Sequence, residues 1–91
     1  MNQVEDYKGV LTDIIKKQMV ILGPSVALGT ARKISSITVS EDGTVTDIKD
    51  PNQAMRDTTT AFVALSGQIF QNILNSILQK YPDINKAAAV Q

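Results

Sequence analysis

Apolar residues recur at helical spacing in three parts of the chain and alternate with polar residues in a fourth. In residues 2–22 the stripe has steps of three or four positions, which is typical of one face of an amphipathic helix. It consists of Val4, Tyr7, Leu11, Ile14, Gln18 and Ile21, with Ile15 and Leu22 on the flank. Gly23 and Pro24 end this pattern, since glycine often closes a helix and proline often starts one. Residues 24–33 then predict a short second helix.

Two β-branched segments predict a β-hairpin over residues 37–48. They flank Asp42-Gly43, and these residue types tolerate the positive φ angles that tight hairpin turns need. An isolated hairpin is marginal in water. We therefore expect a helix to cover one face, and strands of a second chain to pair with an edge.

One helical pattern runs from Asp50, a good N-cap, and Pro51, suited to the first helical turn, to Tyr81. Its apolar positions are Met55, Ala61, Phe62, Leu65, Ile69, Phe70, Ile73, Leu74, Ile77 and Leu78. A straight helix of this length would measure about 45 Å, whereas a globule of this chain length is about 30 Å across. The pattern thus predicts either a kinked helix or one that packs on a second chain.

Thr58–Thr60, Ser66 and Gly67 weaken this long helix, because β-branched residues and glycine are poor helix formers. Two interpretations follow: a close crossing with another helix at Ser66-Gly67, which we favour, or a kink there that folds the helix back over the hairpin. In the first case the apolar stripe forms the interface with a second chain, through Phe62, Leu65, Ile69, Phe70 and Ile73.

The predicted fold class is therefore α+β, with N-terminal helices, one β-hairpin and a long C-terminal helix. Residues 1–82 form a single domain and residues 83–91 a flexible tail. The chain is expected to form a homo-oligomer, most simply a dimer.

Charge and composition narrow the function. Nine basic and nine acidic residues give zero net charge, which argues against a general nucleic-acid binder and removes long-range repulsion between copies. The chain has no cysteine and no histidine, which excludes disulfides and the commonest zinc sites. It has neither a signal-peptide pattern nor an apolar run long enough for a membrane span, so we expect a soluble, cytoplasmic protein.

Candidate catalytic chemistry is sparse. Without histidine or cysteine, acid–base work would fall to scattered Asp, Glu, Lys and Tyr side chains. The turn explains Asp42 and the helix cap explains Asp50. Asp47, Asp50 and Asn52 lack the spacing and the closing glutamate of an EF-hand calcium loop. We therefore expect no enzyme, no cofactor and no metal site.

Two pairs of cations stand at the ends of the first two predicted helices: Lys16 and Lys17, then Arg32 and Lys33. Cations there complement the helix dipole, which is a sufficient structural explanation. The alternative is an anion-binding patch for nucleic acid, a phosphate ligand or a membrane surface.

The segments ARKISSITVSEDGTVTDI and NQAMRDTTTAFVALSGQIFQNILNSI, about half of the chain, resemble part of the roadblock/LC7 family. In that family a strand, an acidic-residue-Gly turn and a second strand lead into a long apolar helix, and three more strands and a last helix follow. The resemblance implies a homodimer that serves as a regulatory scaffold, with sheet or helix pairing across subunits.

The function predicted is a non-enzymatic, dimeric regulatory or scaffold module that acts through protein–protein interaction, with itself and with a larger partner. The alternatives are an anion-responsive binding protein and a self-assembling structural subunit.

Overall fold

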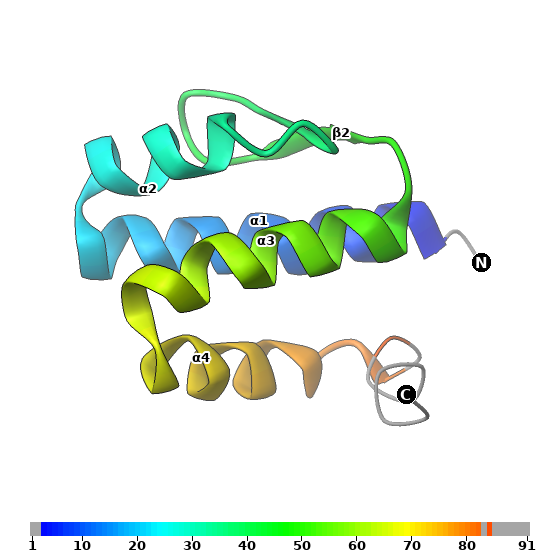
Figure 1. Cartoon of the computed structure of the whole chain (residues 1–91). Coiled ribbons are helices and arrows are strands. Elements are labelled where there is room, and N and C mark those ends of the chain that lie inside the picture. Colours follow the sequence, from blue (N-terminus) through cyan, green and yellow to red (C-terminus); the bar gives the residue numbers. More distant parts are fainter. Residues whose placement is uncertain (1–2, 83, 85–91) are drawn as a thin grey trace.

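The computed structural model describes residues 3–82 and 84, and within these residues four helices accompany one antiparallel β-hairpin (Figure 1). The elements are α1 (Gln3–Leu22), α2 (Pro24–Arg32), β1 (Ile37–Val39), β2 (Val45–Ile48), α3 (Pro51–Ser66) and α4 (Gln68–Leu78). The α+β fold class, the first two helices and the hairpin are thus confirmed. The predicted tail, residues 83–91, lies outside the described residues except for Ile84, which is buried.

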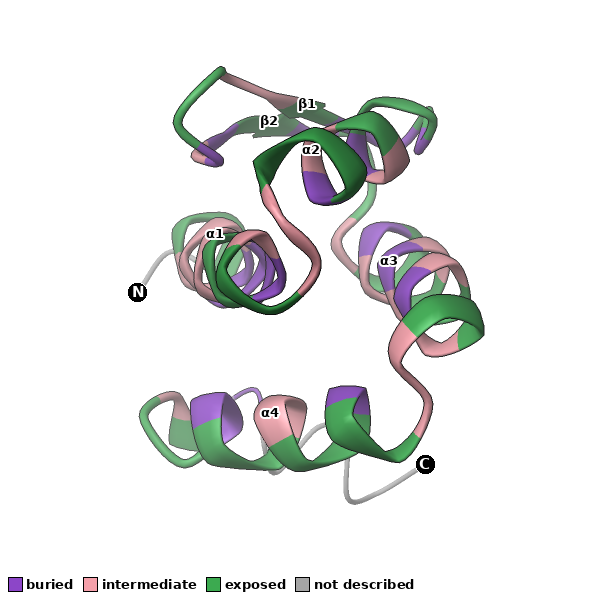
Figure 2. Cartoon of the chain, turned by 90° about the vertical axis from the view of Figure 1, so that its left-hand side faces the viewer, coloured by how far each residue is buried: buried purple, intermediate pink, exposed green. Residues whose placement is uncertain are grey.

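The elements stack in three layers (Figure 2). The hairpin and α2 form the first layer, α1 and α3 lie beside each other in the second, and α4 crosses beneath them. Helix α1 contacts α2, β2, α3 and α4, so it is the central element of the core. Its buried side chains follow the helical stripe and are Tyr7, Val10, Leu11, Ile14, Ile15 and Gln18.

Helix α2 reverses the chain at Gly23 and packs on α1. Pro24 occupies its first turn, as expected. The two side chains that it buries completely, Ala27 and Ala31, are small, which lets the α1 and α2 backbones approach closely.

The hairpin turn forms at Asp42-Gly43, where Gly43 has φ +91° and its N–H donates to the Ser40 carbonyl at 3.1 Å. The strands pair Ile37 with Ile48, and these two buried residues face the core. The backbone N–H of Val45 donates to Thr12 Oγ1 at 2.9 Å, which ties the hairpin to α1. A helix of the same chain therefore covers one face of the hairpin.

The predicted uninterrupted helix from Asp50 to Tyr81 is wrong, because the chain breaks it at Gly67 into α3 and α4. The start is as predicted: Asp50 Oδ1 accepts the backbone N–H of Asn52 at 3.1 Å, and Pro51 stands in the first turn. Of the two interpretations of Ser66-Gly67, the kink is confirmed and the close helix crossing is wrong, since a Cβ at Gly67 would meet nothing within 4 Å. The direction of the kink differs from the prediction: α4 folds back onto α1 and α3, on the side away from the hairpin (Figure 1).

Gly67 makes this reversal possible through φ +59° and ψ −127°, a conformation that residues with a Cβ rarely adopt. The reversal brings Phe62 and Phe70 together, with parallel rings whose centroids are 6.4 Å apart. In a straight helix, residues eight positions apart are separated by about 12 Å along the axis. Both rings are completely buried, so the apolar stripe predicted to face a second chain closes largely on itself.

Because the helix is broken at Gly67, its length no longer indicates that it packs on a second chain. The chain measures 32 × 26 × 18 Å with a radius of gyration of 11.9 Å, so none of the described helices extends beyond the fold. Any case for a second copy must now rest on the surface.

Candidate interaction surfaces

Both inter-helix turns lie at one end of the fold, which Figure 2 shows face-on. Helix α1 ends and α2 begins at Gly23, while α3 ends and α4 begins at Gly67. The sequence around the two turns contains no charged residue over residues 18–31 and 58–79. These two uncharged segments meet at this end of the fold, which we call the uncharged end.

The uncharged end exposes large apolar side chains. Val20 is 81% exposed, the highest value among the large apolar residues described, and four others are 43–52% exposed: Ile21, Val26, Leu65 and Ile69. Apart from Val4 on the first turn of α1, these are the large apolar side chains that the described part of the chain leaves exposed. Exposed apolar side chains that gather at one end of a small protein can mark an interaction site.

The five residues predicted to form an interface divide between interior and surface. Phe62 and Phe70 are completely buried in the core of this chain, and Ile73 is half-buried against it. An interface on this fold would therefore use Leu65 and Ile69 of that set. Val20, Ile21 and Val26 were missed, although the long uncharged segments around them could have pointed to them.

A groove of about 520 Å³ runs between α1 and α4. Helix α1 contributes residues three or four positions apart, and so does α4, with Lys80 just after it; the lining is Asp13, Lys16, Lys17 and Val20 with Ile69, Asn72, Ile73, Ser76, Ile77 and Lys80. The apolar members thus share this groove with three lysines. Since Val20 and Ile69 also belong to the uncharged end, the groove opens onto it.

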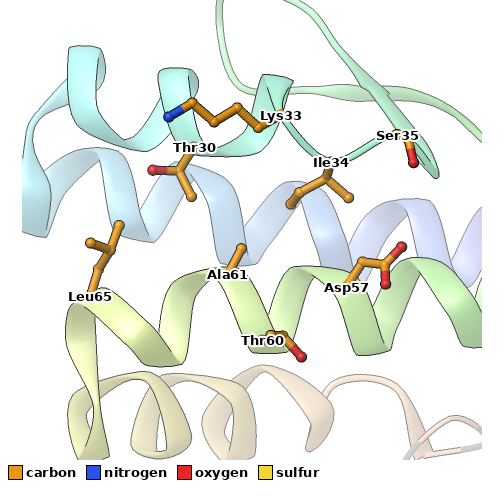
Figure 3. A pocket seen from close by; sticks show the side chains of 8 residues that line it. All are labelled: Thr30, Lys33, Ile34, Ser35, Asp57, Thr60, Ala61 and Leu65. Atoms are coloured by element: carbon orange, nitrogen blue, oxygen red, sulfur yellow. The ribbon is translucent and has the colours of Figure 1, made fainter.

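A second groove of about 490 Å³ lies between α2 and α3 and is lined partly by Lys33, Asp57 and Leu65 (Figure 3). The Asp57 carboxylate accepts hydrogen bonds of 2.7 Å from Ser36 Oγ and from Gln53 Nε2. The Lys33 amine points away from it (Figure 3). The acidic group is thus engaged in holding the segment before β1 to α3, which is a structural role.

The four cations predicted as an anion site do not come together. Lys16 and Lys17 line the α1/α4 groove, whereas Lys33 lines the α2/α3 groove on another side of the fold. Arg32 ends α2 and is exposed. Only Lys16 and Lys17 of the set share a surface, and there Lys80 accompanies them.

The shifted acidic groups have structural explanations. Hydrogen bonds from Ser40 and Thr44 lower the pKa of Asp42 to about 2, so this carboxylate serves the hairpin turn. Burial, with Asp13 nearby, raises the pKa of Tyr81. Among residues 3–82 and 84, no three His, Cys, Asp or Glu side chains are grouped so that they could hold a metal ion.

We found no match for the chain among protein-family models, curated proteins or solved structures. None of the described helices combines the length and hydropathy that crossing a bilayer requires. The surface chemistry described above is accordingly what supports a function for this chain.

Proposed function

We propose that the chain is a non-enzymatic protein–protein interaction module that pairs with a second copy through its uncharged end. The observation that carries this proposal is the gathering of five exposed apolar side chains where the two uncharged segments meet. The scaffold role implied by the roadblock resemblance is part of the same proposal.

A second copy suits this surface for an electrostatic reason. In a two-fold symmetric dimer each patch faces its own copy, so any charge near the axis would meet an identical charge. The uncharged end avoids that repulsion, and the zero net charge of the chain removes the long-range part.

The energetics favour a modest affinity. Complete burial of an exposed Leu or Ile contributes roughly 1.5–3 kcal/mol, so a half-exposed side chain contributes about half of that. Summed over both copies this is comparable with the roughly 4–15 kcal/mol that association costs in lost freedom. The net free energy is therefore small, and a weak dimer that forms only as the concentration is raised is the expected result.

Light scattering coupled to size-exclusion chromatography, over a hundredfold range of concentration, tests the proposal. The expected mass rises from 9.9 kDa to twice that value. Leu65→Lys and Ile69→Lys should abolish the rise, since each places a charge in the patch. Gln71→Lys is the matched control, because it adds the same charge to an exposed position of α4 and should leave the dimer intact.

Two results would overturn the proposal: a monomer at every concentration, or a dimer that tolerates both patch substitutions. Species that keep growing with concentration would favour the self-assembling subunit instead, in which strand edges continue the contact.

A further inference from the structure

The α1/α4 groove combines apolar and cationic side chains. Its apolar lining ranges from Ile77, which is buried, through half-buried Ile73 to Ile69 and Val20, which are exposed. A partly apolar groove between two helices can accept a third helix, whose side chains enter at every third or fourth position.

The described lining carries more positive than negative charge. Lys16, Lys17 and Lys80 line the groove with one described acid, Asp13, and Lys16 also acts on the carboxylate of Asp42 in the hairpin. Lys17 and Lys80 are exposed, and no described carboxylate lies within ion-pairing distance of either amine. The ion pair found between described residues joins Lys8 to Glu5, on the first turns of α1. The chain therefore presents local positive charge despite its overall neutrality.

We propose that this groove binds an amphipathic helix of a partner protein, with apolar residues on one face and Asp or Glu along its flanks. The apolar face covers Ile69 and Ile73, and the acidic flanks meet Lys17 and Lys80. The proposal rests on the proposed function as an interaction module and names the chemistry of the larger partner.

The size of the groove sets the size of the partner segment. Helix α4 has 11 residues, or about 16 Å at 1.5 Å per residue, so a partner helix of roughly three to four turns covers it. The charge complementarity makes a second copy a poor occupant of the same groove, because the patch of exposed residues that a copy would offer is uncharged.

The test is a fluorescence-anisotropy titration of the full chain with a designed peptide of about 14 residues, which places Leu at helical spacing and Glu at the flanks. The control peptide replaces each Glu by Lys. We expect micromolar binding of the acidic peptide that weakens as salt is added, and at least about tenfold weaker binding of the control, equivalent to roughly 1.4 kcal/mol.

Variants locate the site. Lys17→Glu/Lys80→Glu should weaken binding about tenfold or more, because two attractions become repulsions. Arg32→Glu/Lys33→Glu changes the net charge equally but outside the groove, so it should change binding by less than about twofold. Circular dichroism checks that both variants fold, and Lys17→Gln/Lys80→Gln provides a milder loss should charge reversal unfold the chain.

Several outcomes would overturn the proposal. Equal weakening by both charge-reversal pairs would mean general electrostatic attraction, and equal binding of the two peptides would mean no acidic preference. Binding of phosphatidylserine vesicles with the same lysine dependence, but not of the peptide, would assign the groove to a membrane surface.

This test fails independently of the proposed dimer. Val20 and Ile69 belong to both surfaces, so a second copy competes with the peptide for them. Leu65→Lys, which breaks the dimer outside the groove, should therefore not weaken peptide binding, while Lys17→Glu/Lys80→Glu should leave the molar mass unchanged. A chain that dimerises but does not bind the peptide disproves only the groove, and a monomer that binds the peptide disproves only the dimer.

Discussion

Gly9 of α1 lies directly under the side chain of Tyr81, which follows α4. A Cβ atom at Gly9 would come within 2.6 Å of the Tyr81 hydroxyl oxygen and 3.2 Å of two ring carbons. This glycine therefore makes room for an aromatic side chain.

This contact predicts that Gly9→Ala does not give its usual gain. In an exposed helix interior the change stabilises by about 1 kcal/mol, but here the Tyr81 ring must move. We expect no gain, or a loss, in the native chain and the full gain of about 1 kcal/mol in a Tyr81→Ala background. Urea unfolding of the four proteins measures both effects, and an equal gain in the two backgrounds would show that the contact carries no energy.

Gly67 predicts a purely conformational effect. A Cβ there would meet nothing within 4 Å, yet φ +59° is strained for any L side chain. Gly67→Ala should therefore destabilise the chain by about 1–3 kcal/mol. Gly29→Ala is the matched control: its Cβ also meets nothing, but Gly29 lies within α2, so the change should stabilise by up to about 1 kcal/mol. Similar effects at the two sites would contradict this explanation.

Ser66 and Gln18 predict a coupled pair. Gln18 is completely buried, its Oε1 accepts the Ser66 hydroxyl at 2.6 Å, and its Nε2 has no partner in the described part of the chain. Ser66→Ala should cost about 1–3 kcal/mol, because it leaves a buried amide without partners. Adding Gln18→Met, which is apolar and of similar size, should recover most of this loss. The pair would be uncoupled if denaturant unfolding showed additive effects.

Asp42 predicts a dependence on pH. Its pKa is lowered from 3.8 to about 2, chiefly by the Ser40 hydroxyl. Between these values the unfolded carboxyl takes up a proton and the folded one resists, so the stabilisation is present above about pH 4 and is lost as the pH falls to about 2. NMR titration of the Asp42 carboxyl should give the low pKa in the native chain. In Ser40→Ala the pKa should rise; if it does not, the attribution to Ser40 is incorrect.

Local signals predicted the hairpin and the start of α3 correctly. Asp42-Gly43 specifies its turn, and Asp50 caps its helix, through atoms within two residues along the chain. Contacts this short in sequence do not depend on the rest of the fold, so the residue types alone are informative.

The same rules offered the break at Gly67 as one of two interpretations but could not decide between them. Apolar spacing continues through it from Leu65 to Ile69, and a single glycine costs a helix only about 1 kcal/mol. Tertiary packing determines that the helix breaks at Gly67, because folding back stacks Phe70 on Phe62 and buries α4 on α1. The predicted interface mixed buried and exposed residues for the same reason, because periodicity cannot distinguish the buried Phe62 from the exposed Leu65.

The helices alternate in direction, so both inter-helix turns lie at the uncharged end of the fold. Helix α1 starts, and α4 finishes, away from Gly23 and Gly67 (Figure 1). A fluorophore, a bead linker or a fused protein attached ahead of Gln3 would thus lie opposite the uncharged end and leave that end accessible. A chain immobilised in that orientation would expose Val20 and Leu65 to a binding partner in solution.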